Sequence, residues 1–358
     1  MDRRRFLATA GAAGSAALAG CGGLIQTRPA RTTPPVVENR PDGVYVPSHV
    51  EGMEIAGVTR AGGLGFGLMY SYPHRFWNVN GSDVSKTEID DGDEVHLMAS
   101  VWDRETGTVL PETGLTVEIT RDDALVSQET IYPMLSQPMG FHYGANFGLE
   151  GDGTYQVRLN VGGVRTRKTG GFVGRFESAT TATIDFDYER AVRDEISFER
   201  LGDRAGARGA VDPMQMEMLP SSTAPTESAL PGRVVGRASS DDVVFLVTVL
   251  DSPPAGIDAD GQYLAVSART PYNRMVIPAM ALRGTLTRDG ESVFDGELVR
   301  TIDPDLNYHY GAVVDEVTAG DELTVQPRVQ PQTARHEGFE TAFGGVTGPM
   351  SDVSLTVE

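Results

Sequence analysis

Residues 154–161, Thr-Tyr-Gln-Val-Arg-Leu-Asn-Val, place an apolar side chain at every second position. Residues 115–120, Leu-Thr-Val-Glu-Ile-Thr, repeat this alternation. Such runs, bounded by turn residues such as those at 152–153 (Asp-Gly), are typical of strands with one buried and one exposed face. The chain also has 42 glycines and 21 prolines, which fits many turns between short strands. These features predict an all-β protein of the β-sandwich class.

The chain contains an internal repeat at an offset of 167 residues. At this offset residues 142–145 align with residues 309–312, and both read His-Tyr-Gly-Ala. Residues 120–122 and 287–289 also align, and both read Thr-Arg-Asp. Self-similarity at one fixed offset indicates two copies of the same fold. We therefore expect two β-sandwich domains that pack as an intramolecular pseudo-dimer.

A different pattern separates the two copies. Tyr188, Val192 and Ile196 are spaced four apart, which predicts a helix over residues 185–201 that bridges the domains. Residues 202–232 are rich in Gly, Pro, Ser and Ala, as linkers are. The expected boundaries are 47–180 for the first sandwich, 181–232 for the helix and linker, and 233–358 for the second sandwich.

The N-terminal sequence reads as an export and anchoring segment. Residues 3–7, Arg-Arg-Arg-Phe-Leu, followed by a short apolar run, are typical of a twin-arginine signal. The run ends in Leu-Ala-Gly-Cys, which resembles a lipobox, and Cys21 is the only cysteine of the chain. We expect residues 1–20 to be a signal peptide, Cys21 to carry a lipid, and residues 21–46 to be a flexible tether. The alternative is an ordinary signal peptide followed by an incidental cysteine.

The composition excludes several classes of function. The formal net charge is −20, and Lys86 and Lys168 are the only lysines, which indicates a salt-adapted, halophilic source. This charge argues against nucleic acid as a partner. The sequence has no nucleophile elbow, no catalytic cysteine and no glycine-rich phosphate loop. We therefore expect a binding protein and not an enzyme.

Histidines and methionines gather in the first half. His96 and Met98 lie two apart on one predicted strand and therefore share a face. Met134 and His142 lie in a nearby turn-rich segment. Imidazole suits iron, copper or zinc, and thioether sulfur suits copper(I), so the pattern indicates a metal site. The alternative is that the methionines fill the core and the histidines are structural.

Four segments resemble the periplasmic iron-transport protein family, whose lipoprotein and soluble members serve ferrous-iron permeases. The segments are residues 52–58, 95–99, 133–134 and 142–146. The resemblance covers about residues 47–175 and implies an immunoglobulin-like sandwich that binds copper or iron through His, Met and Glu. It implies that His96, Met134 and His142 are metal ligands and that Glu54 is an acidic residue of the site. Met98 stands where the family has a glutamate, which favours copper over iron.

The resemblance also implies a later histidine, in an Arg-His pair. That position is Lys-Thr at residues 168–169 in the first half and Arg-His at 335–336 in the second. In the second half Tyr263, Ala265 and Thr301 replace the other ligands, and His309 remains. We therefore expect His336 to complete the first site across the domain interface. Direct ligation needs about 2 Å, so a separation above about 15 Å between His336 and His142 would exclude it.

These features predict an extracytoplasmic lipoprotein, anchored to the outer face of the cell membrane, that delivers iron or copper to a membrane permease. The alternative is a metal-free adhesion or scaffold protein, in which the same residues pack without converging. A copper redox enzyme is disfavoured because the first sandwich offers no cysteine for a blue-copper site.

Three further features carry weaker signals, and two of them allow two interpretations. His74, within Tyr-Pro-His-Arg-Phe-Trp, is expected to be a hydrogen-bonded loop residue, with a second metal ligand or a partner contact as the alternative. His49 is expected in a loop. Met214, Met216 and Met218 would share one face of a strand, where they either pack on a domain or bind copper.

Overall fold

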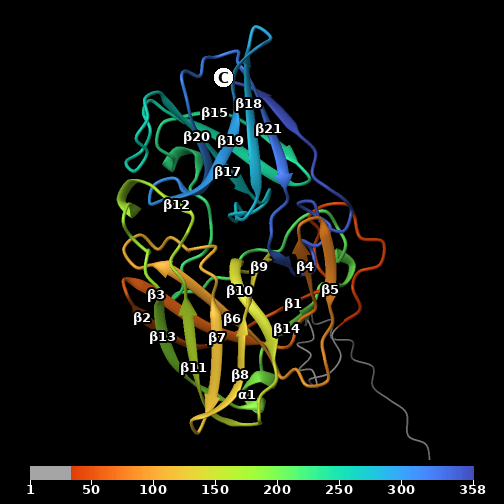
Figure 1. Cartoon of the computed structure of the whole chain (residues 1–358). Helices are drawn as coiled ribbons and strands as arrows, with labels where there is room; N and C mark the ends of the chain where they lie inside the picture. The colour runs from red at the N-terminus through yellow and green to blue at the C-terminus, as the bar shows by residue number, and fades with distance from the viewer. Residues whose placement is uncertain (1–33) are drawn as a thin grey trace, which may run out of the picture.

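The structure is a computed structural model that describes residues 34–358, so the expected signal peptide, Cys21 and the first half of the expected tether (residues 21–33) lie outside the described residues. The described chain forms two β-rich bodies placed end to end, the first half below the second in Figure 1. The prediction of an all-β architecture with two domains is confirmed. Within residues 34–358, no helix has the length and apolarity needed to cross a membrane.

The first half is built from two facing sheets. The larger has the order β2-β3-β6-β10-β9-β22-β4-β5, and the smaller has the order β13-β11-β7-β8. Strand β11 alternates buried and exposed residues as predicted, and its buried side chains join those of the larger sheet in one core. The strands are β2 (Glu54–Ala61), β3 (Leu64–Ser71), β4 (Phe76–Asn80), β5 (Asp83–Thr87), β6 (Val95–Asp103), β7 (Thr116–Arg121), β8 (Ala124–Thr130), β9 (Tyr132–Ser136), β10 (Gly140–Phe147), β11 (Gly153–Val161) and β13 (Thr180–Tyr188).

The second half repeats this arrangement along one continuous path of strands. The order is β15-β16-β17-β20-β19-β18-β21-β23. Strand β19 pairs first with β18 and then with β20, and so passes from one layer to the other. The strands are β15 (Arg233–Ser240), β16 (Val243–Leu250), β17 (Gln262–Arg269), β18 (Ala281–Arg288), β19 (Glu291–Asp303), β20 (Asn307–Val314), β21 (Glu322–Val329) and β23 (Val353–Thr356).

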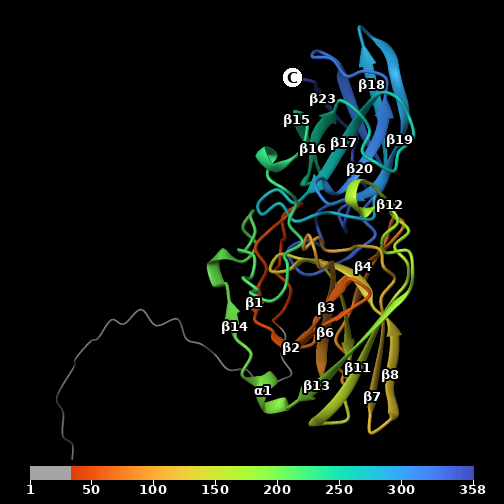
Figure 2. The ribbon, with the colours of Figure 1, turned by 90° about the vertical axis from the view of Figure 1, so that its left-hand side faces the viewer.

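Each half contributes a two-residue strand to a sheet of the other half. Strand β22 (Ala334–Arg335) runs parallel to β9 of the first half, with Ala334 opposite Met134. Strand β12 (Arg167–Lys168) runs parallel to β19 of the second half, with Arg167 opposite Thr301. Both pairings occupy the same position of the repeat, and Figure 2 shows β12 at the junction of the halves. This exchange carries His336 into the first half.

Two sequence expectations are wrong. Only α1 (Arg190–Asp194) is helical within residues 185–201, because β13 extends to Tyr188 and β14 (Phe198–Arg200) pairs with β1 (His49–Glu51). The helix therefore packs on the first half and does not bridge the domains. The end of the expected tether is also folded: Val44, Tyr45 and Val46 are buried, and the Tyr45 backbone donates to the Gly338 carbonyl.

Candidate metal centre

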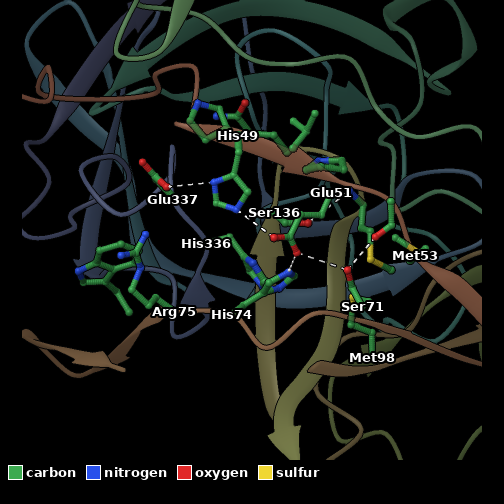
Figure 3. Close-up of a pocket in the computed structure, with 17 residues that line it drawn as sticks. His49, Glu51, Met53, Ser71, His74, Arg75, Met98, Ser136, His336 and Glu337 are labelled. Atoms are coloured by element: carbon green, nitrogen blue, oxygen red, sulfur yellow. Dashed lines mark hydrogen bonds and ion pairs between the residues drawn. The ribbon is translucent and has the colours of Figure 1, made fainter. Parts of the chain in front are cut away.

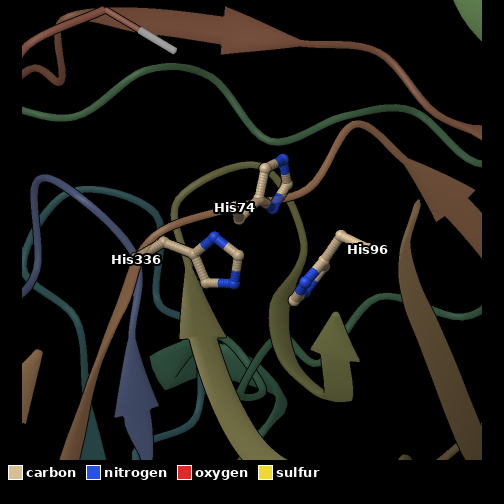
Figure 4. Close-up of side chains that lie close together, drawn as sticks. All are labelled: His74, His96 and His336. Carbon is tan, nitrogen blue, oxygen red and sulfur yellow. The ribbon is translucent and has the colours of Figure 1, made fainter. Parts of the chain in front are cut away.

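Four histidines from separate parts of the chain converge beside the end of β10. His74 lies in the loop between β3 and β4, His96 on β6, His142 on β10, and His336 directly after β22. One ring nitrogen from each of His74, His96 and His336 lies within 4.8 Å of the others (Figure 4). The His142 ring lies 5.4 Å from the His336 ring, between ring centroids. The halves of the repeat therefore meet at one cluster of imidazoles.

Three of these rings are held through one nitrogen each. His96 Nδ1 lies 2.8 Å from Asn146 Oδ1, and His142 Nδ1 lies 3.1 Å from the Gly140 carbonyl oxygen. His74 Nε2 lies 2.8 Å from a Glu51 carboxylate oxygen. The Asn146 side-chain amide donates to the His74 carbonyl, which fixes the orientation of its oxygen towards His96. Because all three partners are oxygens, the held nitrogen donates its proton and leaves the other nitrogen with a free lone pair.

The free nitrogens are buried without a hydrogen-bond partner in the described part of the chain. They are His74 Nδ1, His96 Nε2, His142 Nε2 and His336 Nε2. Burial lowers the pKa of His142 to about 4 and lowers the pKa of His96 and of His336 well below the ordinary range. The rings of His96, His142 and His336 are therefore neutral near pH 7. Unpaired buried polar atoms are costly, and neutral imidazoles with free lone pairs are the form that binds a metal cation.

The thioether of Met134 lies beside these rings. Met134 is fully buried on β9, directly opposite His142 on β10. A Cβ atom added to Gly144 would lie 2.8 Å from His96 Nε2 and 3.0 Å from Met134 Sδ. The imidazole and the thioether thus border the same small space, which stays open because residue 144 has no side chain. A sulfur ligand is therefore available next to the nitrogens.

A buried carboxylate supports the centre from behind. The Glu51 side chain is only 5% exposed and lies between His49 Nε2, at 3.2 Å, and His74 Nε2, at 2.8 Å (Figure 3). Burial alone would raise its pKa, but the His74 and His49 rings outweigh that effect and lower the pKa of Glu51 to about 2. A negative charge therefore sits one hydrogen bond behind His74. Such carboxylate–histidine pairs orient metal ligands and raise their basicity.

A buried arginine positions His336. The Arg335 guanidinium is fully buried and donates to the carbonyls of Pro331, Ala342 and Phe343, which closes the loop around it. The His336 backbone then donates to the Leu135 carbonyl on β9, at 3.1 Å. The second half therefore holds this imidazole against the first half through a rigid loop.

The structure brings together most, but not all, of the candidate ligands. His96, Met134, His142 and His336 lie in one group, and the separation of His336 from His142 is far below the 15 Å limit. Met98 lines the same pocket as His74 and His336 but packs among other methionines. Glu54 is exposed at the start of β2, and the acidic residue beside the histidines is Glu51.

Sequence reasoning missed part of this centre. His74 is a hydrogen-bonded loop residue, as expected, and it also belongs to the histidine cluster, as the alternative interpretation allowed. His49 lies on β1 and not in a loop. No local pattern marks Glu51, because its partners come from a loop and from its own short strand.

Comparisons with known proteins agree with the resemblance read from the motifs. Residues 90–194 match the family described as Fe2+ transport protein, and residues 228–355 match a domain of unknown function (DUF7350). No curated protein matches the chain.

Solved structures with a similar arrangement include a copper-bound variant of FetP from uropathogenic Escherichia coli strain F11. It is 19% identical, with a TM-score of 0.29 over 38% of this chain and 97% of that chain. A copper-bound variant of Campylobacter jejuni P19 is also 19% identical, with a TM-score of 0.28 over 39% of this chain and 97% of that chain. By its match to the family model, the first half of this protein is similar to the Fe2+ transport protein family over residues 90–194, as its histidine and methionine motifs predicted.

Proposed function

We propose that this protein binds one transition-metal cation, iron or copper, through His74, His96, His142 and His336, with Met134 beside them. The observation that carries the proposal is the set of four buried ring nitrogens that lack a partner in the described chain. Imidazole nitrogen suits iron and copper, and a thioether favours copper(I). The metal-free scaffold predicted no convergence of these residues, and their grouping disfavours it.

The charges near the centre also support cation binding. Imidazole binds a metal cation in its neutral form, so ligation by histidine brings no negative charge to the cation. The Glu51 carboxylate supplies one negative charge behind His74. The net charge of −20 over the whole chain raises the local concentration of cations at the surface. A cation therefore gains electrostatic stabilisation without a carboxylate in direct contact.

The cellular role proposed here is uptake. The export signal and lipobox read from the sequence support a protein anchored through Cys21 at the outer face of the membrane. The match of residues 90–194 to the Fe2+ transport family supports delivery of the cation to a membrane permease by a protein that is not an enzyme. In this proposal the two halves act as an intramolecular pseudo-dimer, and the second half supplies His336.

Metal titration of the mature protein tests the proposal. Iron(II), copper(II) and copper(I) would be titrated separately into the wild type and into His336→Ala. Because His336 lies in a partly exposed loop, its truncation should leave the fold intact, as circular dichroism can check. We expect one tightly bound equivalent of iron(II) or of copper(II) in the wild type, and an affinity for these ions reduced by more than about 100-fold in the variant, beyond the roughly 10- to 100-fold losses from supporting residues.

The matched control is His309→Ala, at the position of the repeat that corresponds to His142. It should bind metal as the wild type does. Metal binding that is unchanged in His336→Ala would contradict the proposal.

A further inference from the structure

A cluster of methionines lies next to the histidines. Met69, Met98 and Met139 form one buried cluster with Leu219, and the half-buried Met53, Met216, Ile55 and Trp102 pack against it. Met69 on β3 is directly opposite Met98 on β6. We name these five methionines the methionine cluster. They come from five separate segments, so the fold itself gathers the thioethers.

The methionine cluster opens into the same pocket as the histidines. Met53, Met98 and Met139 line this pocket together with His74 and His336. Figure 3 shows Met53 and Met98 on one side of Glu51, and His336 on the other. The pocket therefore has a thioether wall and an imidazole wall. Thioethers placed only to fill a core would not need to line a cavity.

The segment between the two domains delivers Met216 to the cluster. The Val211 backbone donates to Gln137 Oε1 at 2.8 Å, and the Met214 backbone donates to the Pro138 carbonyl at 2.8 Å. These bonds fasten the segment onto the turn that carries Met139. A hollow on the outer side of this segment is lined by Met214 and Met216. Thioethers thus run from this outer hollow to the pocket.

We propose that the methionine cluster is a second metal site, which binds copper(I) through thioether sulfur. Thioethers are soft, neutral ligands that suit copper(I) and bind hard cations weakly. The single charge of copper(I) would be offset by the Glu51 carboxylate on the wall of the same pocket. The thioether site would prefer the soft copper(I) ion over iron, whereas imidazoles bind both iron and copper. The inference goes beyond the histidine centre and does not rest on that centre being occupied.

Anaerobic titration with copper(I) against a chromophoric chelator tests this site, with X-ray absorption to detect copper–sulfur bonds. The test variant is Met53→Leu combined with Met216→Leu, because leucine keeps the volume and apolarity of these half-buried side chains. The matched control is Met218→Leu, from the same Met-x-Met-x-Met motif, whose side chain is 58% exposed.

We expect the double variant to lose about tenfold or more in copper(I) affinity and to lose copper–sulfur signal, while its copper(II) binding is unchanged. The control should match the wild type. Unchanged copper(I) affinity in the double variant, or an equal loss in Met218→Leu, would overturn the second site.

A third variant separates this inference from the proposed function. His74→Ala combined with His336→Ala removes two imidazoles and leaves the methionine cluster intact. Copper–sulfur bonds should persist in it, while copper(II) binding is lost. If the copper–sulfur bonds disappear, the thioethers do not form an independent site. If copper(II) binding persists, the histidine centre is wrong and the methionine site stands by itself.

Discussion

The two halves of the molecule share a strand pattern and differ in what fills the space beside the His-Tyr-Gly-Ala motif. In the first half, His142 Nε2 has no partner within the described residues, and other unpaired nitrogens surround it. In the second half, His309 Nε2 bonds the Tyr263 hydroxyl at 3.0 Å, and the Arg167 guanidinium donates to that hydroxyl and to the Gly311 carbonyl, both at 2.9 Å. The first half leaves the lone pairs of its imidazoles free. In the second half a tyrosine hydroxyl occupies the imidazole nitrogen, and the Arg167 guanidinium supplies a fixed positive charge beside it.

This difference shows how one scaffold can carry a centre or lack one. Strand β12 brings Arg167 to the second half, and β22 brings His336 to the first, through equivalent pairings. The identity of one or two residues on each exchanged segment therefore decides the chemistry. A guanidinium supplies a fixed internal charge, whereas an imidazole supplies another ligand.

The largest effect that tests the comparison comes from the two glycines of the motif. Gly144→Ala would place a Cβ atom 2.8 Å from His96 Nε2 and 3.0 Å from Met134 Sδ, in the space where we propose the cation. Metal affinity should fall by about 100-fold or more, because two ligands must move. Calorimetric titration with copper(II) measures this change.

The equivalent change in the second half should act on stability alone. Gly311→Ala would place its Cβ atom 2.0 Å from the Tyr263 hydroxyl, which Arg167 and His309 hold in place. The melting temperature should fall while the metal affinity stays that of the wild type. Metal binding that survives Gly144→Ala would show that the space beside this glycine is not the cation site.

The next effect concerns the supporting carboxylate. Glu51→Gln keeps the shape of the side chain but removes the charge behind His74. Metal affinity should fall by about 10- to 100-fold, the usual range for such supporting groups. Glu54→Gln is the control, since Glu54 is exposed and lies on the same segment of chain. Equal affinities for the two variants in a competition assay would argue against a role for Glu51.

A smaller effect is expected from removing the half-buried Arg167 guanidinium from the second half. Arg167→Met removes the half-buried donor to the Gly311 carbonyl, the Tyr263 hydroxyl and the Thr301 hydroxyl. The free energy of unfolding should drop by about 2 kcal/mol, as for other unpaired buried groups. Denaturant titration measures the drop. If Arg167→Met also lowered the metal affinity, the metal centre of the first half would depend on the packing of the second half.

The smallest effect is the acid sensitivity of the metal-free protein. Burial lowers the pKa of both His142 and His309 to about 4, from an unfolded value near 6.5. Because the unfolded chain binds more protons between these values, stability should fall as the pH drops from 6.5 towards 4 and should level off below. Each ring should contribute about 1 kcal/mol of loss by pH 5.5.

Denaturant titrations over this pH range, on the wild type and on His309→Gln, check that contribution. Bound metal should protect the His142 half only, because a coordinated imidazole cannot take a proton. A slope that is unchanged by His309→Gln would show that this ring does not govern the acid response.

The sequence predicts the sandwiches well because strand alternation and the repeat are local or regularly spaced signals. The helix prediction failed because Tyr188, Val192 and Ile196 belong to three different segments, and their four-residue spacing is coincidental. His96, Met134 and His142 were identifiable because they lie on neighbouring strands and within a recognisable motif. Glu51 was not, and His74 was a metal ligand only in the alternative interpretation, because their hydrogen bond joins a short edge strand to a loop and leaves no periodic trace.

The exchange of β12 and β22 between the two halves has a consequence at low protein concentration. A centre shared between two separate chains would come apart on dilution, since its assembly would depend on how often the chains meet. Here a covalent link keeps the borrowed segment permanently near its acceptor, so its effective concentration is independent of the amount of protein present. The metal centre would thus be fully assembled in each molecule, whether the protein is expressed at a low or a high level.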